Sequence, residues 1–269
     1  PRDHSSAAPA VENGQLLARP ATLPRSGETG ASRLAVRDFS DRKRETPFLT
    51  LFSFFLLPSQ RSEAEKVMTS LQEHELMWTR ADAILEQSQN PNTKFFALQV
   101  MDGVIKYRWN ALPDDQREGI KNFISNLIIK LSTDASSFRR DRAFINKINN
   151  VLVQILKHDW PKRWSSFVPD LVGAAKQSES LCENCMNILR LLSEEVFDFS
   201  RGERTQAKIT ELKNALNTDF PIIHELCEFV LQHSQKPELI QQTLQTLHAF
   251  LSWIPLGYIF ESTLLDTLL

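Results

Sequence analysis

Apolar residues recur at spacings of three and four from about residue 62 to the end of the chain, which is the pattern of amphipathic helices. Ser62 and Glu65 have the spacing of a capping box that opens such a helix. Prolines mark boundaries between helices, and no alternation typical of strands competes with the helical period. The pattern predicts helices over about 62–74, 76–88, 93–110, 113–131, 138–159, 164–176, 180–199, 205–234, 237–253 and 256–269.

These helices are joined by short connections, and taken in pairs they give a unit of about 40 residues, the size of a HEAT or armadillo repeat. In such arrays each pair buries its apolar face only against its neighbours. We therefore predict an all-α fold, a HEAT-repeat α-solenoid. The last predicted helix ends on an apolar face with no polar cap, so we expect the native array to continue beyond it.

Residues 1–61 do not share this pattern. Residues 1–46 are rich in Pro, Ser, Ala, Arg and Gly, and we expect them to form a disordered leader. The apolar run at 48–57 is shorter than the roughly 20 residues that cross a bilayer. Three interpretations remain open for it: a non-native or spliced-in leader, which we favour, a helix docked on the body, or a membrane anchor. We assign no function to this segment.

The amino-acid composition excludes several classes of function. The 269 residues carry a net charge of −2, whereas a dedicated nucleic-acid-binding protein is usually strongly basic. Eight glycines are too few for a turn-rich sandwich or barrel, and those past residue 60 form no glycine-rich phosphate loop. Three cysteines cannot form a disulfide framework, so we expect a reducing compartment.

The chain offers few candidates for catalysis or metal binding. Cys182 and Cys185 have CxxC spacing, but no second pair completes a zinc site and no strand precedes them as in redox motifs. We expect both to pack inside a helix, and keep a zinc or redox protein as the alternative. Glu194 and Glu195 are adjacent, so they point to different helix faces. We predict no catalytic residue, no metal site and no cofactor.

One cluster mixes basic and aromatic side chains, at residues 157–164 (KHDWPKRW). Such a cluster could stack against the bases of a nucleic acid. We favour a corner between helices, in which Trp side chains are packed and Lys side chains are solvated.

Polar stripes remain opposite the apolar ones. A single stripe is most simply solvated surface, but alternate helices of a repeat array line the same side together. Three stripes on every second helix therefore predict an extended surface of mixed charge that binds a protein partner. The stripes comprise Gln99, Asp102, Lys106 and Asn110 on the third helix, Asn146, Asn150, Gln154 and Lys157 on the fifth, and Glu183, Asn187, Arg190 and Glu194 on the seventh.

Four stretches resemble the nuclear export receptors of the importin-β (karyopherin) superfamily. Their amino-acid sequence is closest to the plant forms of these receptors. They are 92–113 (NTKFFALQVMDGVIKYRWNALP), 149–164 (NNVLVQILKHDWPKRW), 179–202 (ESLCENCMNILRLLSEEVFDFSRG) and 252–265 (SWIPLGYIFESTLL). The resemblance covers about residues 62–269, which read as an importin-β N-terminal-like region followed by export-receptor repeats. It does not reach residues 1–61.

The resemblance implies a ring-like HEAT solenoid whose N-terminal repeats hold Ran-GTP with their inner helices. We assign that contact to the three polar stripes. It also implies cargo with leucine-rich export signals, bound in a groove beyond residue 269, and nucleoporins as further partners. The implied protein is not an enzyme, binds neither nucleic acid directly nor membranes, and shuttles between nucleus and cytoplasm through the nuclear pore. The alternative is another karyopherin or a generic HEAT-repeat scaffold.

Overall fold

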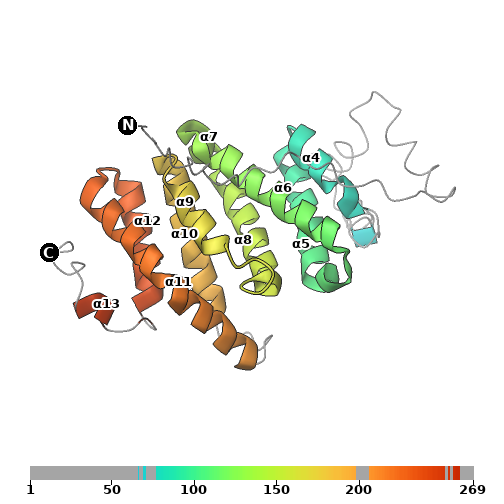
Figure 1. The fold of residues 1–269 in the computed structure, drawn as a ribbon. Helices are drawn as coiled ribbons and strands as arrows, with labels where there is room; N and C mark the ends of the chain where they lie inside the picture. The colour runs from blue at the N-terminus through green and yellow to red at the C-terminus, as the bar shows by residue number, and fades with distance from the viewer. Residues whose placement is uncertain are drawn as a thin grey trace, which may run out of the picture.

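In the computed structural model of this chain, the described residues form an array of helices (Figure 1). They comprise residues 77–197 and 206–251, with Lys66, Thr69, Ser70, Ile254 and residues 257–260. The predicted leader over 1–61, most of the predicted helix over 62–74 and the end of the last predicted helix lie outside this part of the chain.

Every regular element among the described residues is helical, as the periodicity predicts. The elements are η2 (Met77–Arg80), α4 (Ala81–Gln87), α5 (Pro91–Arg108), η3 (Trp109–Ala111), α6 (Asp114–Thr133), α7 (Ala135–Arg140), α8 (Arg142–Asp159), α9 (Phe167–Ala175), α10 (Glu179–Phe197), α11 (Gln206–His233), α12 (Pro237–Leu251) and α13 (Gly257–Phe260).

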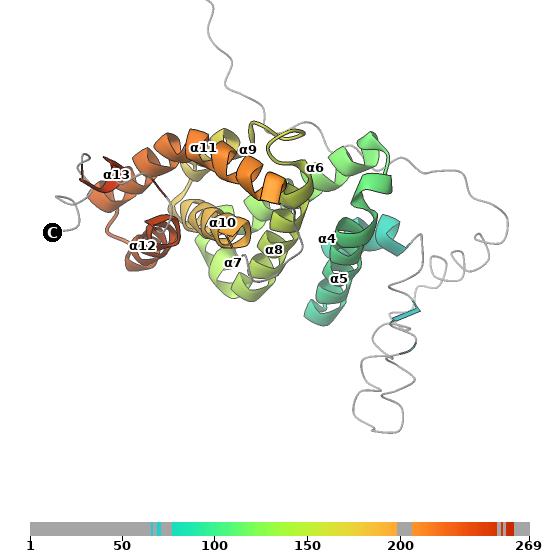
Figure 2. The same ribbon diagram turned by 90° about the horizontal axis from the view of Figure 1, so that it is seen from below.

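The helices form two layers, seen edge-on in Figure 2. One layer holds α6, α9 and α11, and the other holds α5, α8, α10 and α12, while α4 packs against α5 at the end of the array. Helices of the second layer run parallel: near their starts Phe95 of α5 contacts Phe144 of α8, and near their ends Trp109 contacts Asp159. When helix pairs stack in an array, the second helices of successive pairs run parallel to one another. The chain is thus an α-solenoid of HEAT type, as predicted.

A continuous apolar core runs between the two layers from α4 to α12. Its largest members are almost fully enclosed, among them Trp109, Trp160, Phe96, Phe220 and Phe250. Burying each such side chain contributes about 1.5–3 kcal/mol. No pair of helices could bury this surface by itself, so neighbouring pairs stabilise one another.

Local capping fixes where helices begin. Asn90 is the N-cap of α5, and its side-chain oxygen accepts hydrogen bonds from the backbone N–H groups of Asn92 (2.9 Å) and Thr93 (3.5 Å). Pro91 follows at the first helical position, where its missing N–H costs nothing. Residues 90–92, which separate two predicted helices, therefore begin α5 as well as interrupting the chain after α4.

The predicted helix over 138–159 is wrong in one respect, because it is two helices, α7 and α8, that break at Asp141. The carboxylate of Asp134 accepts bonds from the Ser137 N–H (2.8 Å) and the Ser136 hydroxyl (2.5 Å). These bonds start a short helix in the gap between the helices predicted over 113–131 and 138–159, and they lower the pKa of Asp134 to about 2, the bond from Ser136 having the larger effect. Side-chain capping thus overrides the periodicity here.

Candidate protein-interaction surface

The stripe on α5 lies on the open side of that helix. Gln99 and Lys106 are exposed, and the Lys106 ammonium lies 2.8 Å from Asp102 Oδ2. Asn110 falls one turn later, in η3, where its side-chain oxygen accepts a hydrogen bond from Arg163 (3.1 Å). The predicted stripe is therefore present and its charged pair is preformed.

The stripes on α8 and α10 meet side by side. Asn187 of α10 donates to the side-chain oxygen of Asn146 on α8 over 3.0 Å. Asn150 is exposed on α8, and Gln154 is half-buried one turn further along. Lys157 forms an ion pair with Glu195 at the far end of the two helices. These contacts join two separate sequence stripes into one surface.

Arg190 organises the polar groups on α10. Its guanidinium donates to Glu194 Oε1 (2.5 Å) and to the side-chain oxygen of Asn187 (3.0 Å). Glu194 and Glu195 thus face different partners, as their adjacency predicted, because Glu195 binds Lys157 instead.

Glu183 does not lie on the open surface where the stripe on α10 predicted it. This carboxylate is buried on α10 and forms ion pairs with Arg142 of α8 (3.1 Å) and with Lys236, just before α12 (3.0 Å), so it does not face a partner. The first turns of α10, where Glu183 lies, are covered by α8 and by the segment before α12. A helical period cannot distinguish a charged residue that is paired inside the array from one that faces solvent.

We call the other predicted residues the polar ridge. Its members are Gln99, Asp102, Lys106, Asn110, Asn146, Asn150, Gln154, Lys157, Asn187, Arg190 and Glu194. Sequence reasoning missed Lys147, whose ammonium lies 3.9 Å from Asp102 and ties α8 to α5 across the ridge. No local signal could have found this contact, because the two residues are far apart in the chain.

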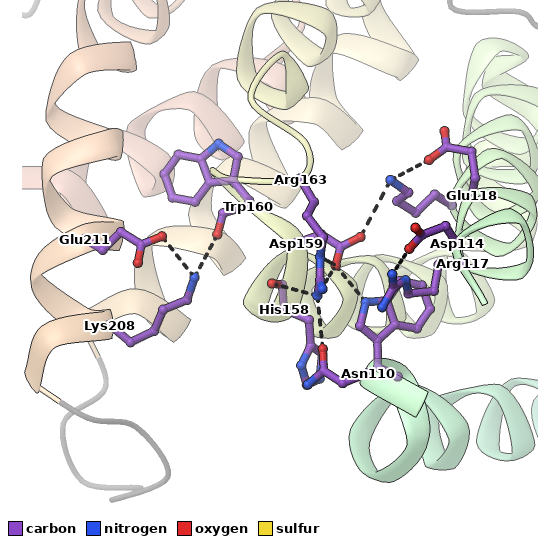
Figure 3. A network of polar contacts seen from close by, with 12 residues as sticks. Asn110, Asp114, Arg117, Glu118, His158, Asp159, Trp160, Arg163, Lys208 and Glu211 are labelled. Atoms are coloured by element: carbon purple, nitrogen blue, oxygen red, sulfur yellow. Dashed lines mark hydrogen bonds and ion pairs between the residues drawn. The ribbon is translucent and has the colours of Figure 1, made fainter. Parts of the chain in front are cut away.

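The basic and aromatic cluster at 157–164 forms a corner between helices, shown in Figure 3. Asp159 is buried and accepts hydrogen bonds from the Trp109 indole (2.8 Å) and from Arg163 (2.8 Å), while Lys121 lies 3.6 Å away. Three groups from η3, α6 and the corner itself therefore meet around one carboxylate.

The corner also contacts α11, in the other layer of helices. Lys208 of α11 donates to the carbonyl oxygen of Trp160 (3.2 Å) and pairs with Glu211 (Figure 3). The Trp160 side chain is fully enclosed, so it cannot stack against a base. Lys162 stays largely exposed. The corner interpretation is confirmed for the packed Trp160 and the solvated Lys162, whereas Lys157 is largely covered and paired with Glu195.

The cysteines lie inside the core. Cys182 and Cys185 sit on α10 and Cys227 on α11, all three as buried free thiols. Burial, helped by the charge of Glu179, raises the pKa of Cys182 to about 11, and burial raises the pKa of the other two as well. A thiol with so high a pKa is a poor nucleophile and metal ligand. Packing is the role these residues fill.

Metal binding and membrane insertion are two other functions to consider for the described residues. No group of three or more His, Cys, Asp or Glu side chains lies together there in a way that could hold a metal ion. Nor does that part of the chain contain a helix whose length and apolar character would let it cross a membrane.

Comparison with known proteins places the array in a family. A model of the importin-beta N-terminal domain matches residues 64–130, and a model of exportin 1-like proteins matches residues 141–269. Protein EXPORTIN 1A of Arabidopsis thaliana is 60% identical over 222 residues, which are 82% of this chain and 21% of that protein. The chain belongs to the exportin-1 family.

Other exportin-1 relatives agree. Exportin-1 of Drosophila melanogaster is 52% identical over 206 residues, 77% of this chain and 19% of that protein. Exportin-1 of Schizosaccharomyces pombe is 47% identical over 208 residues, again 77% of this chain and 19% of the relative. Identity is thus higher with the plant protein, as the sequence predicted. The chain spans about a fifth of the length of these exportin-1 relatives.

Proposed function

We propose that this chain is the Ran-GTP-binding part of a nuclear export receptor. Membership of the exportin-1 family carries the proposal, because the relatives that match most of this chain are exportins by name. The chain also matches the importin-beta N-terminal domain, and its second layer of parallel helices presents a polar surface of mixed charge. Such a surface suits a folded protein partner rather than a small substrate.

The polar ridge supplies the contact with Ran-GTP. Its side chains are held in place before binding: Lys106 by Asp102, Asn187 by Asn146, and Glu194 by Arg190. Preorganised side chains lose less conformational entropy when a partner binds, so more of the contact energy appears as affinity. Lys106, Asn150 and Glu194 are exposed and can reach a partner directly.

The mechanism is linkage between two partners and involves no catalysis. Ran-GTP and a cargo with a leucine-rich export signal each favour the same conformation of the whole receptor, so each raises the affinity for the other. Hydrolysis of GTP on Ran removes one partner and releases the cargo. The receptor shuttles between nucleus and cytoplasm, and nucleoporins carry it through the pore. This chain alone keeps the Ran contact and does not couple it to cargo.

The proposal is tested by immobilising the chain and measuring how tightly it binds Ran loaded with GTP or with GDP. We expect binding of the GTP form at least about tenfold tighter than that of the GDP form, a coupling of the usual size. Lys106→Glu combined with Arg190→Glu should weaken binding, because both reverse charges on the ridge. Lys130→Glu on α6, exposed on the other layer, is the matched control and should leave binding unchanged.

Absent binding of Ran, or equal binding of both nucleotide forms, would overturn this proposal. Equal binding would instead favour a generic HEAT-repeat scaffold. Nucleotide-dependent binding that the ridge variants leave intact would keep the receptor function and remove the ridge as its site.

A further inference from the structure

Two features of α5 have no explanation within the fold. Tyr107 is 85% exposed, the highest value among the large apolar side chains of the described residues. Gly103 lies one turn earlier, inside the helix, where glycine is less favourable than alanine by about 1 kcal/mol. Single exposed aromatics are common, but the pairing of the two features is not accounted for by packing.

Gly103 is not required by its surroundings. A Cβ atom placed there would meet no atom within 4 Å, and the residue has no left-handed backbone that would favour glycine. The space above it is open. A helical side chain leans toward the turn before it, so the ring of Tyr107 lies beside this open space.

Gly103 and Tyr107 continue the helical stripe of Phe96 and Val100, which are buried near the start of α5, whereas Tyr107 is exposed near its end. Leu98 and Ile105 of the same helix are fully buried in the core, whereas Asp102 and Trp109 face α8 and the corner. Two ridge residues, Gln99 and Lys106, lie four positions before and three positions after Gly103 and therefore border it on the helix surface. The open space is therefore continuous with the polar ridge.

The surrounding charge is positive. Asp102 is one carboxylate shared by two ammonium groups, those of Lys106 (2.8 Å) and Lys147 (3.9 Å). Arg108, the next residue along the chain, is exposed and adds a positive charge to the last turn of α5. A partner that lies over this site would therefore be favoured if carboxylates flank its contact.

We propose that Gly103 and Tyr107 form an aromatic shelf on α5 that receives an apolar side chain flanked by carboxylates on Ran-GTP. The choice of Ran-GTP rests on the proposed function. A missing side chain at Gly103 leaves room for the partner, and the Tyr107 ring supplies a rigid apolar contact with a polar tip. Tyrosines that become buried when two proteins bind contribute a large share of the energy of many interfaces.

Two variants of the full chain test the aromatic shelf, and the quantity measured is the Kd for Ran-GTP. Gly103→Gln fills the open space and Tyr107→Ala removes the ring, and each should raise Kd about tenfold or more. Gly173→Gln on α9 is the matched control for the first, since a Cβ there also meets no atom within 4 Å. Phe229→Ala on α11 is the control for the second, since this ring is 58% exposed. Both controls should leave Kd unchanged.

Stability separates a binding defect from misfolding. Gly103→Gln replaces glycine by a good helix former in open space, so the melting temperature should stay equal or rise by about 2 °C. Nucleotide-dependent binding that survives both shelf variants overturns the shelf alone, whereas absent binding by the unchanged chain overturns the proposed function with it. Self-association of the chain that Tyr107→Ala abolishes would assign the shelf to a second copy and so overturn the choice of Ran.

Discussion

At the scale of single residues, a few buried polar groups stabilise this array at sites where helices meet. Asp159 is 1% exposed and satisfies an indole, a guanidinium and an ammonium group from three segments. A buried charge of this kind costs desolvation energy, which its partners offset. Removing it leaves those partners uncompensated, so the effect of mutation exceeds the net contribution of the contacts.

Asp159→Ala should therefore lower the free energy of unfolding by about 3–5 kcal/mol, because Lys121 then stays buried without its second carboxylate. Urea denaturation followed by circular dichroism measures this. Glu225→Gln, exposed on α11, is the control and should change stability by less than about 0.5 kcal/mol. A loss below about 1 kcal/mol for Asp159→Ala would show that the corner adds little to stability.

The buried cysteines lead to a second prediction about single residues. Because the pKa of Cys182 is raised to about 11, only about one molecule in a thousand carries the thiolate there at pH 8. A thiol reagent should react slowly with the native chain and rapidly with all three thiols in denaturant. The rate at Cys182 should rise with pH up to about pH 11. Fast labelling of the native chain at pH 8 would contradict the assignment of packing roles.

At the scale of elements, α8 and α10 are joined by a reciprocal amide pair. Asn149 donates to Asn184 over 2.7 Å, and Asn184 donates back over 3.3 Å, both side chains being buried. The amides satisfy each other only when the two helices lie in this register. The pair thus resists sliding of one helix along the other, which apolar contacts alone allow more easily.

A double-mutant cycle measures this pair. Asn149→Ala and Asn184→Ala should each cost about 1–3 kcal/mol, because each leaves one buried amide unsatisfied. The double variant should cost less than the sum of the two by about 1 kcal/mol or more, since no unpaired amide remains. Additive costs from the chemical denaturation of all four proteins would mean that the two amides do not interact.

At the scale of the whole molecule, each helix pair is stabilised by its neighbours, and ion pairs tie successive pairs together. Glu183 of α10 binds Arg142 at the start of α8 and Lys236 just before α12. Thr246 of α12 also donates to the carbonyl oxygen of Met186 (2.8 Å). In an array with only neighbour contacts, weakening one joint should affect the adjacent units and spare distant ones.

Glu183→Gln should therefore increase hydrogen exchange in α12 and at the start of α8, while exchange in α5 stays unchanged. The cause is two cations left without their carboxylate at that joint. Mass spectrometry of exchanged peptides gives the readout, with Glu225→Gln as the control. A uniform increase along the chain would indicate one cooperative unit instead of coupled neighbours.

The sequence alone determined the all-helical class, most helix positions and the family, because apolar spacing and long matching stretches are local properties of the chain. Tertiary structure decided what the polar residues do. The spacing that placed Glu194 on a free surface placed Glu183 there too, yet α8 and the segment before α12 bury the latter. Contacts such as that of Lys147 with Asp102, and the open space above Gly103, depend on which helices pack side by side. Solvent exposure is a property of the assembled array, so no local pattern in the chain can encode it.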